Sequence, residues 1–268
     1  MTTLSSDNTL QQHINGAWQE IQTDPHHRLQ VNTRLTLYDL LVRDVGMMRE
    51  FGENVHIRFF PQVTPGLKRY WYLGLQTIMP LLPLWEREMN RWLRSNPDYE
   101  PDRSFPFIIV DATQDLLQGK TYDEVDTLLP QKTEYWTGMS SWHYVVGNMT
   151  DDLPYTARMC LHAIYNVHRA VCGLPPIGSR FSDGAYDEDL SPYSNRDWTY
   201  YAFEAVMSAA TSIGDEQQFD TRPTKRDPHK ALDFWYWWLF EVVPSAATVN
   251  LDTLGWQITQ PWYSKSAT

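Results

Sequence analysis

The segment between Asp227 and Pro244 constrains the fold most, because it reads as one aromatic helix with a defined start and stop. Asp227 can accept hydrogen bonds from the first unpaired N–H groups, and Pro228 occupies the first helical position, where its missing donor costs nothing. Pro244 is expected to end the helix, since proline disrupts a helix interior. One face carries three large apolar side chains: Trp235, Trp238 and Val242. A helix this aromatic must be largely buried against other elements.

The composition indicates a globular chain with an aromatic core. The 268 residues suffice for one large domain, and 12 Trp, 15 Tyr and 10 Phe supply bulky apolar side chains. Each buried aromatic side chain removes roughly 150–250 Å² from water. A chain of this size can therefore be stable without disulfide bonds or bound metal ions.

Proline, glycine and capping residues divide the chain into helical segments. The apolar spacing predicts helices over residues 27–50, 66–95, 105–118, 151–172, 196–213 and 228–244. Pro80 and Pro83 should kink or break the second of these, and Gly119 should cap the third. The sequence thus predicts an all-α fold, a single multi-helix orthogonal bundle with an aromatic-rich core. We divide it into a polar N-terminal segment (1–26), a helical domain (27–250) and a C-terminal tail (251–268).

The net charge of −11, with a pI of about 5.1, restricts the partners that can bind. Nucleic acid and anionic membranes are not expected as partners, since phosphate recognition needs clustered Lys and Arg. An acidic surface keeps a protein soluble, and it also attracts a basic protein partner.

The two cysteines, Cys160 and Cys172, fall on one predicted helix, which would hold them about 18 Å apart and prevent a disulfide. We interpret both as small buried hydrophobic residues in a reducing compartment. The first residues lack a basic, then apolar, signal segment, and no apolar run is long enough to cross a bilayer. A cytoplasmic protein is therefore expected.

No motif for catalysis or cofactor binding stands out. The patterns GxSxG, GxxxxGK, GxGxxG and CxxC are all absent. His162 and His168 lie six residues apart, on different faces of a helix, so they cannot hold one metal ion together. We therefore expect no catalytic residue, no cofactor and no metal.

Three stretches together resemble the Imm5 family, the predicted all-helical immunity proteins of bacterial polymorphic toxin systems. They are Leu-Pro-Leu-Trp-Glu at 82–86, Asp-Ala-Thr-Gln-Asp-Leu-Leu-Gln-Gly at 111–119, and the aromatic pair of segments at 197–202 and 234–246. Their order and spacing match that family from about residue 66 to 247. The position between the first two tryptophans of the last stretch, where the family usually has a charged residue, holds Tyr236.

The resemblance implies an inhibitor that binds a cognate intracellular toxin, often a nuclease. An acidic face would then cover a basic catalytic cleft and speed association electrostatically. We expect this face on the polar 173–195 stretch, with aromatic anchors beside the carboxylates. The candidate partner-binding residues are Asp183, Tyr186, Asp187, Glu188, Asp189 and Tyr193.

A second interpretation is a cytosolic enzyme or a small-ligand-binding helical protein with an aromatic-lined pocket. In it, Glu86 or His162 would supply the polar contact to the ligand. The candidate pocket residues are Trp85, Glu86, His162, Trp198, Trp235 and Trp238. Core packing of the tryptophans, and a capping or ion-pair role for Glu86, remain the structural alternatives.

Overall fold

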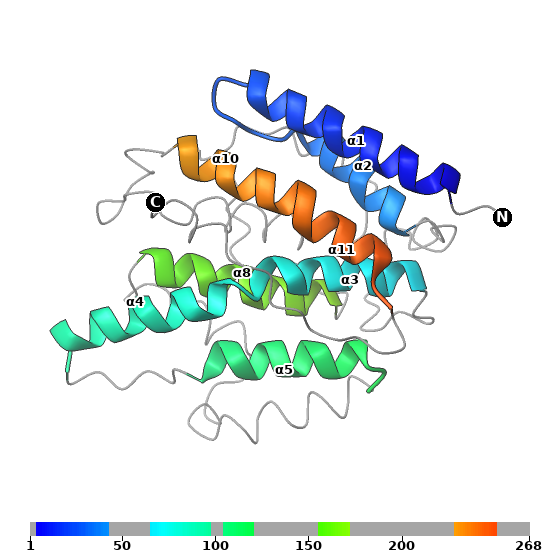
Figure 1. Ribbon diagram of the computed structural model, residues 1–268. Helices are drawn as coiled ribbons and strands as arrows, with labels where there is room; N and C mark the ends of the chain where they lie inside the picture. Colours follow the sequence, from blue (N-terminus) through cyan, green and yellow to red (C-terminus); the bar gives the residue numbers. More distant parts are fainter. Residues whose placement is uncertain (1–3, 43–64, 98–103, 121–154, 172–227, 251–268) are drawn as a thin grey trace, which may run out of the picture.

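Every regular element among the described residues is a helix (Figure 1). The computed structural model describes residues 4–42, 65–97, 104–120, 155–171 and 228–250. In chain order its elements are α1 (Leu4–Thr23), α2 (Val31–Val42), α3 (Pro65–Ile78), α4 (Leu81–Ser95), α5 (Phe105–Leu117), α8 (Tyr155–Val171), α10 (Pro228–Trp237), the π-helical turn η3 (Trp238–Val242) and α11 (Val243–Thr248). The all-α class predicted from the sequence is confirmed for this part of the chain.

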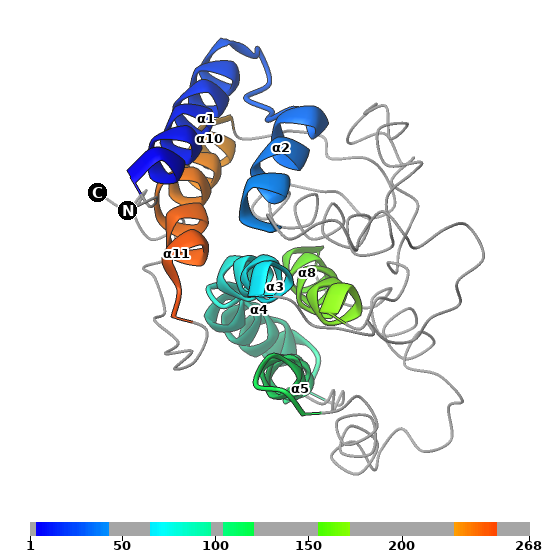
Figure 2. The same cartoon turned by 90° about the vertical axis from the view of Figure 1, so that its right-hand side faces the viewer.

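Helix α3 lies at the centre of the described helices. It packs against α2, α8, α11, α5 and η3, and Figure 2 shows it surrounded by them. Every residue from Tyr70 to Ile78 is buried. A helix that is enclosed on all sides needs apolar residues all round, and the Tyr-Trp-Tyr-Leu run of α3 supplies them.

The core is rich in aromatic residues, as the composition predicts. The largest fully buried side chains are Trp85, Trp237, Trp238, Tyr38, Tyr70, Phe105, Phe234 and Ile14. Figures 1 and 2 show the axes of α3, α5 and α8 lying broadly parallel, with α1, α2, α10 and α11 inclined to them. Other segments of the chain lie outside the described residues, so the orthogonal arrangement of the whole bundle stays a prediction.

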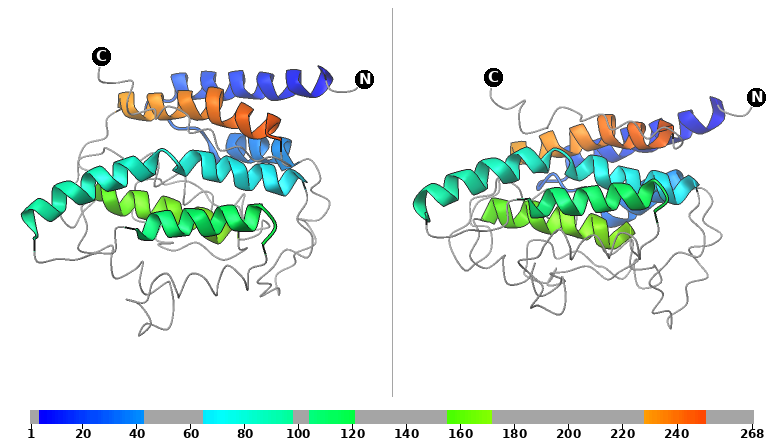
Figure 3. Two further views of the ribbon diagram at one scale, coloured as in Figure 1. Left: turned by 60° about the horizontal axis from the view of Figure 1, so that its bottom comes forward. Right: turned by 90° about the horizontal axis from the view of Figure 1, so that it is seen from below.

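Pro80 breaks the long helical segment into α3 and α4, as predicted. The residues between the two helices form a turn, in which the Leu82 N–H group donates to the Met79 carbonyl over 3.3 Å. Pro83 falls in the first turn of α4, where a proline is tolerated, and it is exposed. Figure 3 shows α4 continuing beyond this bend to the edge of the molecule.

Gly119 ends α5, which confirms the predicted cap. Its φ of 98° is the left-handed conformation that glycine adopts without strain. The Gly119 N–H group donates to the Leu116 carbonyl at 3.1 Å, and the Lys120 N–H group donates to the Asp115 carbonyl at 3.0 Å. These two bonds form a Schellman motif, which satisfies the last carbonyls of the helix.

The aromatic helix begins at Pro228, as predicted, but it does not end at Pro244. One wide turn, η3, precedes the proline, and the helix continues as α11 to Thr248. In that turn the Val243 N–H group donates to the Trp238 carbonyl, five residues back. The extra residue widens the helix where a proline ring would otherwise meet the carbonyl four residues before it. The expectation that Pro244 ends the helix is therefore wrong.

The structure also differs from the sequence prediction at the N-terminus. Residues 1–26 are predicted as a polar segment outside the helical domain, but Leu4–Thr23 form α1. Its Ile14, Ala17 and Ile21 are buried in the same core as the other helices. Leu10 and Trp18 of the same helix, both partly buried, also pack against this core.

Several predictions fall outside the described residues. These are the helix at 196–213, residues 43–50 of the helix predicted at 27–50, both ends of the 151–172 helix, Cys172 and the tail at 251–268. Residues 27–30 are described and are not helical, so α2 begins at Val31, four residues later than predicted. Among the helices that are described, none combines the length and the apolar character needed to cross a membrane.

Candidate functional site

The predicted partner-binding residues lie outside the described part of the chain. Asp183, Tyr186, Asp187, Glu188, Asp189 and Tyr193 all belong to the 172–227 segment, and so does Trp198 of the predicted pocket. Trp85, Glu86, Trp235 and Trp238 of that pocket lie within the described residues.

The structure brings the tryptophans of the predicted pocket into one core. Trp85, Trp235 and Trp238 are all buried in the same cluster. Trp235 and Trp238 meet edge to face, with ring centroids 5.8 Å apart and planes at 86°. Tyr38 of α2 meets Trp238 in the same manner at 6.3 Å. Such edge-to-face pairs place the positive edge of one ring on the negative face of the next.

Glu86 does not join this aromatic cluster. Trp85 is fully buried, whereas the adjacent Glu86 is exposed, because successive helical residues project about 100° apart. His162 lies on α8, but its side chain is not among those described. Two polar residues of α3, Gln76 and Thr77, are buried in this core instead.

Thr77 joins α3 to the aromatic helix by a buried hydrogen bond. The Trp238 indole N–H group donates to Thr77 Oγ1 over 3.1 Å. The Thr77 hydroxyl in turn donates to the Leu73 carbonyl at 2.8 Å. Both polar groups are thereby satisfied inside the core, which is the condition for burying them at low cost.

Gln76, the residue before Thr77, is buried without such partners. Its side chain is 1% exposed, and neither its amide nitrogen nor its amide oxygen has a hydrogen-bond partner. Arg69, two turns earlier on the same face, has a buried Nε that likewise lacks one. The sequence alone did not lead us to expect a role for this pair. Its signal is a glutamine inside an otherwise apolar buried run.

A second buried polar contact links α5 to α8. Thr113 Oγ1 lies 3.0 Å from His168 Nδ1 and 2.7 Å from the Ile109 carbonyl. Because a carbonyl can only accept, the single hydroxyl proton goes to Ile109, and His168 Nδ1 must then donate to Thr113. Tyr165 stacks on the imidazole at 6.3 Å. This arrangement fits a satisfied core histidine.

A smaller aromatic group lies at the surface between α1 and the aromatic helix. Trp18 meets Tyr236 at 5.3 Å and Phe240 at 6.0 Å, both edge to face. Tyr236 is 48% exposed, whereas Trp18 and Phe240 are half-buried. We call these three residues the α1 clamp, because they fasten α1 onto α10 and η3.

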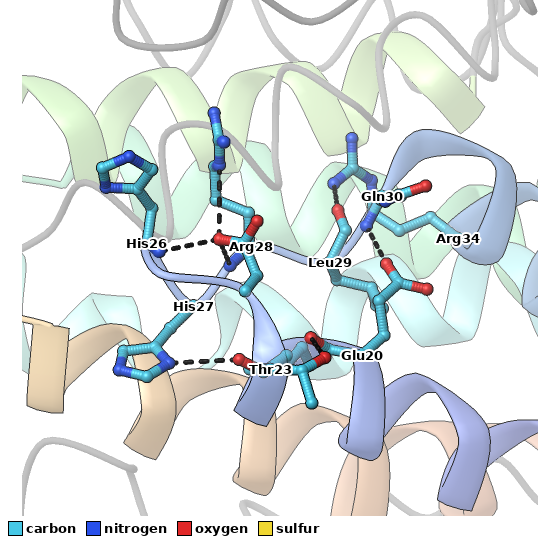
Figure 4. A network of polar contacts seen from close by, with 10 residues as sticks. Glu20, Thr23, His26, His27, Arg28, Leu29, Gln30 and Arg34 are labelled. Atoms are coloured by element: carbon cyan, nitrogen blue, oxygen red, sulfur yellow. Dashed lines mark hydrogen bonds and ion pairs between the residues drawn. The ribbon is translucent and has the colours of Figure 1, made fainter.

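The connection between α1 and α2 is held by two carboxylates (Figure 4). Glu20 accepts from the Gln30 N–H group at 2.5 Å and from the Thr33 hydroxyl at 2.6 Å. Its negative charge therefore lies at the N-terminus of α2, where unpaired N–H groups favour an anion. Buried Arg34 also donates from Nη1 to the Leu29 carbonyl.

Asp24 stabilises the same connection. Its carboxylate accepts from the His26 N–H group at 2.8 Å and from the Arg28 N–H group at 3.1 Å, and it pairs with the Arg28 side chain at 3.6 Å. Burial alone would raise the pKa of Asp24, but the two N–H groups and the charge of Arg28 lower it below its ordinary value.

Charge is divided unevenly between the described helices and the rest of the chain. The described residues hold 10 Asp and Glu against 11 Lys and Arg, whereas the whole chain holds 33 against 22. Residues 121–154 hold 6 acidic and 1 basic residue, and residues 172–227 hold 10 and 5. The acidic excess of the protein is thus carried by the segments between the described helices, and not by the helices themselves.

The described residues contain no group of three or more His, Cys, Asp or Glu side chains that could hold a metal ion. Burial raises the pKa of the Cys160 thiol far above its usual value, so Cys160 stays neutral at physiological pH. Cys160 is fully buried, which confirms its interpretation as a small buried hydrophobic residue.

Comparisons of the chain with protein family models, with curated proteins and with solved structures find no match. The resemblance to the Imm5 family therefore stays a prediction based on its three sequence stretches.

Proposed function

We propose that this protein is an immunity-type protein, which binds and neutralises a cognate intracellular toxin of basic charge through an acidic surface. The observation that carries the proposal is the division of charge. The described helices are nearly neutral, and the acidic excess falls on residues outside them. An acidic excess of this size attracts a basic partner.

Electrostatic attraction would act mainly on the rate of association. A basic cleft and an acidic surface attract each other over about 8 Å at physiological ionic strength, so added salt should slow their encounter. Within the 172–227 segment, we assign the contact to Asp183, Asp187, Glu188 and Asp189. Tyr186 and Tyr193 are the aromatic anchors, because tyrosine contributes large apolar area to interfaces.

The first experiment is to purify the tagged protein from the cells that naturally produce it and to identify what accompanies it by mass spectrometry. The expected result is a basic protein in stoichiometric amount. A protein that purifies alone from these cells would contradict the proposal.

Charge reversal then tests the assigned surface. Asp187→Lys with Glu188→Lys should slow association with the captured partner several-fold and reduce the dependence of the rate on salt. The matched control is Glu86→Lys with Asp111→Lys, which makes the same change of charge on exposed positions of α4 and α5. Equal slowing by both pairs would show that net charge alone matters and would reject the assigned residues.

One observation favours a second function, the binding of a small ligand. The amide of buried Gln76 makes no hydrogen bond in the structure, so its donors and its acceptor suit a polar ligand. The aromatic residues around α3, including Trp238, would supply the apolar part of such a site.

A further inference from the structure

Gln76 and Arg69 lie on one face of the central helix. Seven residues are close to two helical turns, so the two side chains project in nearly the same direction, about 10 Å apart along the axis. Arg69 is half-buried, whereas Gln76 is fully enclosed. The face therefore runs from a cation near the surface to an amide inside the core.

The adjacent residue, Thr77, is a buried polar side chain of the same helix whose hydrogen bonds are all made. Thr77 is as deeply buried as Gln76, but its hydroxyl both donates to Leu73 and accepts from Trp238. Gln76 has two donor protons and an acceptor oxygen, and none of them is used. An amide buried in this way destabilises a fold, and such groups are rare in proteins unless something else binds them.

The chemistry of the two side chains defines what would fit. A carboxamide presents a donor and an acceptor side by side, so its complement is another amide or a peptide group. A guanidinium presents only donors and a permanent positive charge, so its complement is a carboxylate or a phosphate. The separation along the helix corresponds to roughly three residues of an extended peptide at about 3.3 Å each.

We propose that this face of α3 binds a small anionic amide, with its amide paired to Gln76 inside the core and its acidic group held by Arg69 near the surface. A short peptide with a free terminal carboxylate has this chemistry. The inference specifies the second, ligand-binding function and does not depend on the toxin-binding one.

The test uses acetyl-trialanine, which ends in a carboxylate, and its terminal amide, which has the same length without the charge. Both are titrated into the full-length protein by calorimetry. The wild-type protein should bind the acid at least tenfold more tightly than the amide. Arg69→Met should remove this preference, whereas Lys68→Met, a change of the same charge at the adjacent half-buried position, should keep it.

Gln76→Leu should weaken binding of both probes at least tenfold. Its melting temperature should be equal to or higher than that of the wild type, because the substitution removes an unpaired buried amide. An unchanged or raised melting temperature would show that weaker binding by Gln76→Leu does not result from unfolding.

Three results would overturn the inference. Equal binding of acetyl-trialanine by wild type and Gln76→Leu would place any ligand elsewhere and leave the general ligand-binding function standing. Failure of the wild type to bind either probe would reject the anionic-amide ligand. A lower melting temperature for Gln76→Leu would mean that Gln76 is satisfied by ordered water and contributes to the fold.

Discussion

Trp238 donates its indole N–H group to the Thr77 hydroxyl over 3.1 Å, although the two residues are 161 positions apart in the chain. This bond fastens the C-terminal aromatic helix to the central helix inside the core. It also fixes the orientation of the indole ring, since its donor has to find an acceptor once it is buried.

Thr77→Val should lower the free energy of unfolding by about 1–3 kcal/mol, because the valine keeps the shape and leaves the buried Trp238 N–H group without an acceptor. Chemical denaturation measures this change. In a double-mutant cycle, Trp238→Phe should cost less in the Thr77→Val background than in the wild type, because the donor has already lost its partner.

The matched control is Thr36→Val on α2. The Thr36 hydroxyl makes the same bond to the carbonyl four residues back, at 2.9 Å, but it is exposed. Its loss should change stability by no more than about 0.5 kcal/mol. If both substitutions cost the same, the bond to Trp238 contributes nothing measurable.

The parts of the fold that the sequence predicted are those decided by local chemistry. Pro80 separates α3 from α4 and Gly119 ends α5, because a missing N–H group and a left-handed φ act within one turn. The burial of Trp235, Trp238 and Val242 followed from their helical spacing.

The parts of the fold that the sequence did not predict depend on tertiary packing. The rule that proline disrupts a helix predicted an end at Pro244. However, Val242, Val243 and Ala246 are buried on both sides of the proline, and this burial favours a continuous helix with one wide turn. Helix α1 was missed because Ile14, Ala17 and Ile21 stand among polar residues, and only the surface that they meet makes them a core stripe.

For the candidate site, residue types were visible in the sequence but their partners were not. Glu86 follows a buried tryptophan and is nevertheless exposed. Gln76 is visible in the sequence as a polar residue within the apolar stretch of α3. Only the folded structure shows that its amide has no hydrogen-bond partner. Spacing predicts which residues share a face, whereas only the packing shows which polar atoms are left unsatisfied.

Ile14→Ala should lower the free energy of unfolding by about 2–5 kcal/mol, because it leaves a cavity where α1 meets the core. Gln12→Ala, an exposed position on the same helix, should stay within about 0.5 kcal/mol of the wild type. Denaturant midpoints measure both. A small effect of Ile14→Ala would mean that α1 contributes little to stability, and residues 1–26 would then be a dispensable segment.

Asp24→Asn should destabilise the protein at neutral pH and matter less as the pH falls. The folded-state pKa of Asp24 lies below that of the unfolded chain. Its contribution is therefore fully present above about pH 4 and is lost as the pH falls through the lower folded-state value. Denaturation of both proteins from neutral pH to about pH 3 measures the difference.

The control for this series is Asp111→Asn, an exposed carboxylate on α5. Its difference from the wild type should stay small at every pH, since exposed carboxylates contribute little. An Asp24→Asn difference that does not change with pH would mean that the ionised form is not favoured by the turn.

His168 should carry its proton on Nδ1 when its ring is neutral. The Thr113 hydroxyl has one proton, and the Ile109 carbonyl at 2.7 Å can only accept it, so the 3.0 Å contact to His168 requires an Nδ1–H donor. Long-range proton–nitrogen correlation spectra distinguish the two neutral tautomers, and His13, which is exposed on α1, provides an internal reference.

Thr113→Val removes the acceptor and should lower the free energy of unfolding by about 1–3 kcal/mol, whereas Thr113→Ser keeps the hydroxyl and should cost less. A proton on Nε2 would contradict this assignment, because Nδ1 would then have to accept from Thr113 and the Ile109 carbonyl would lose its donor.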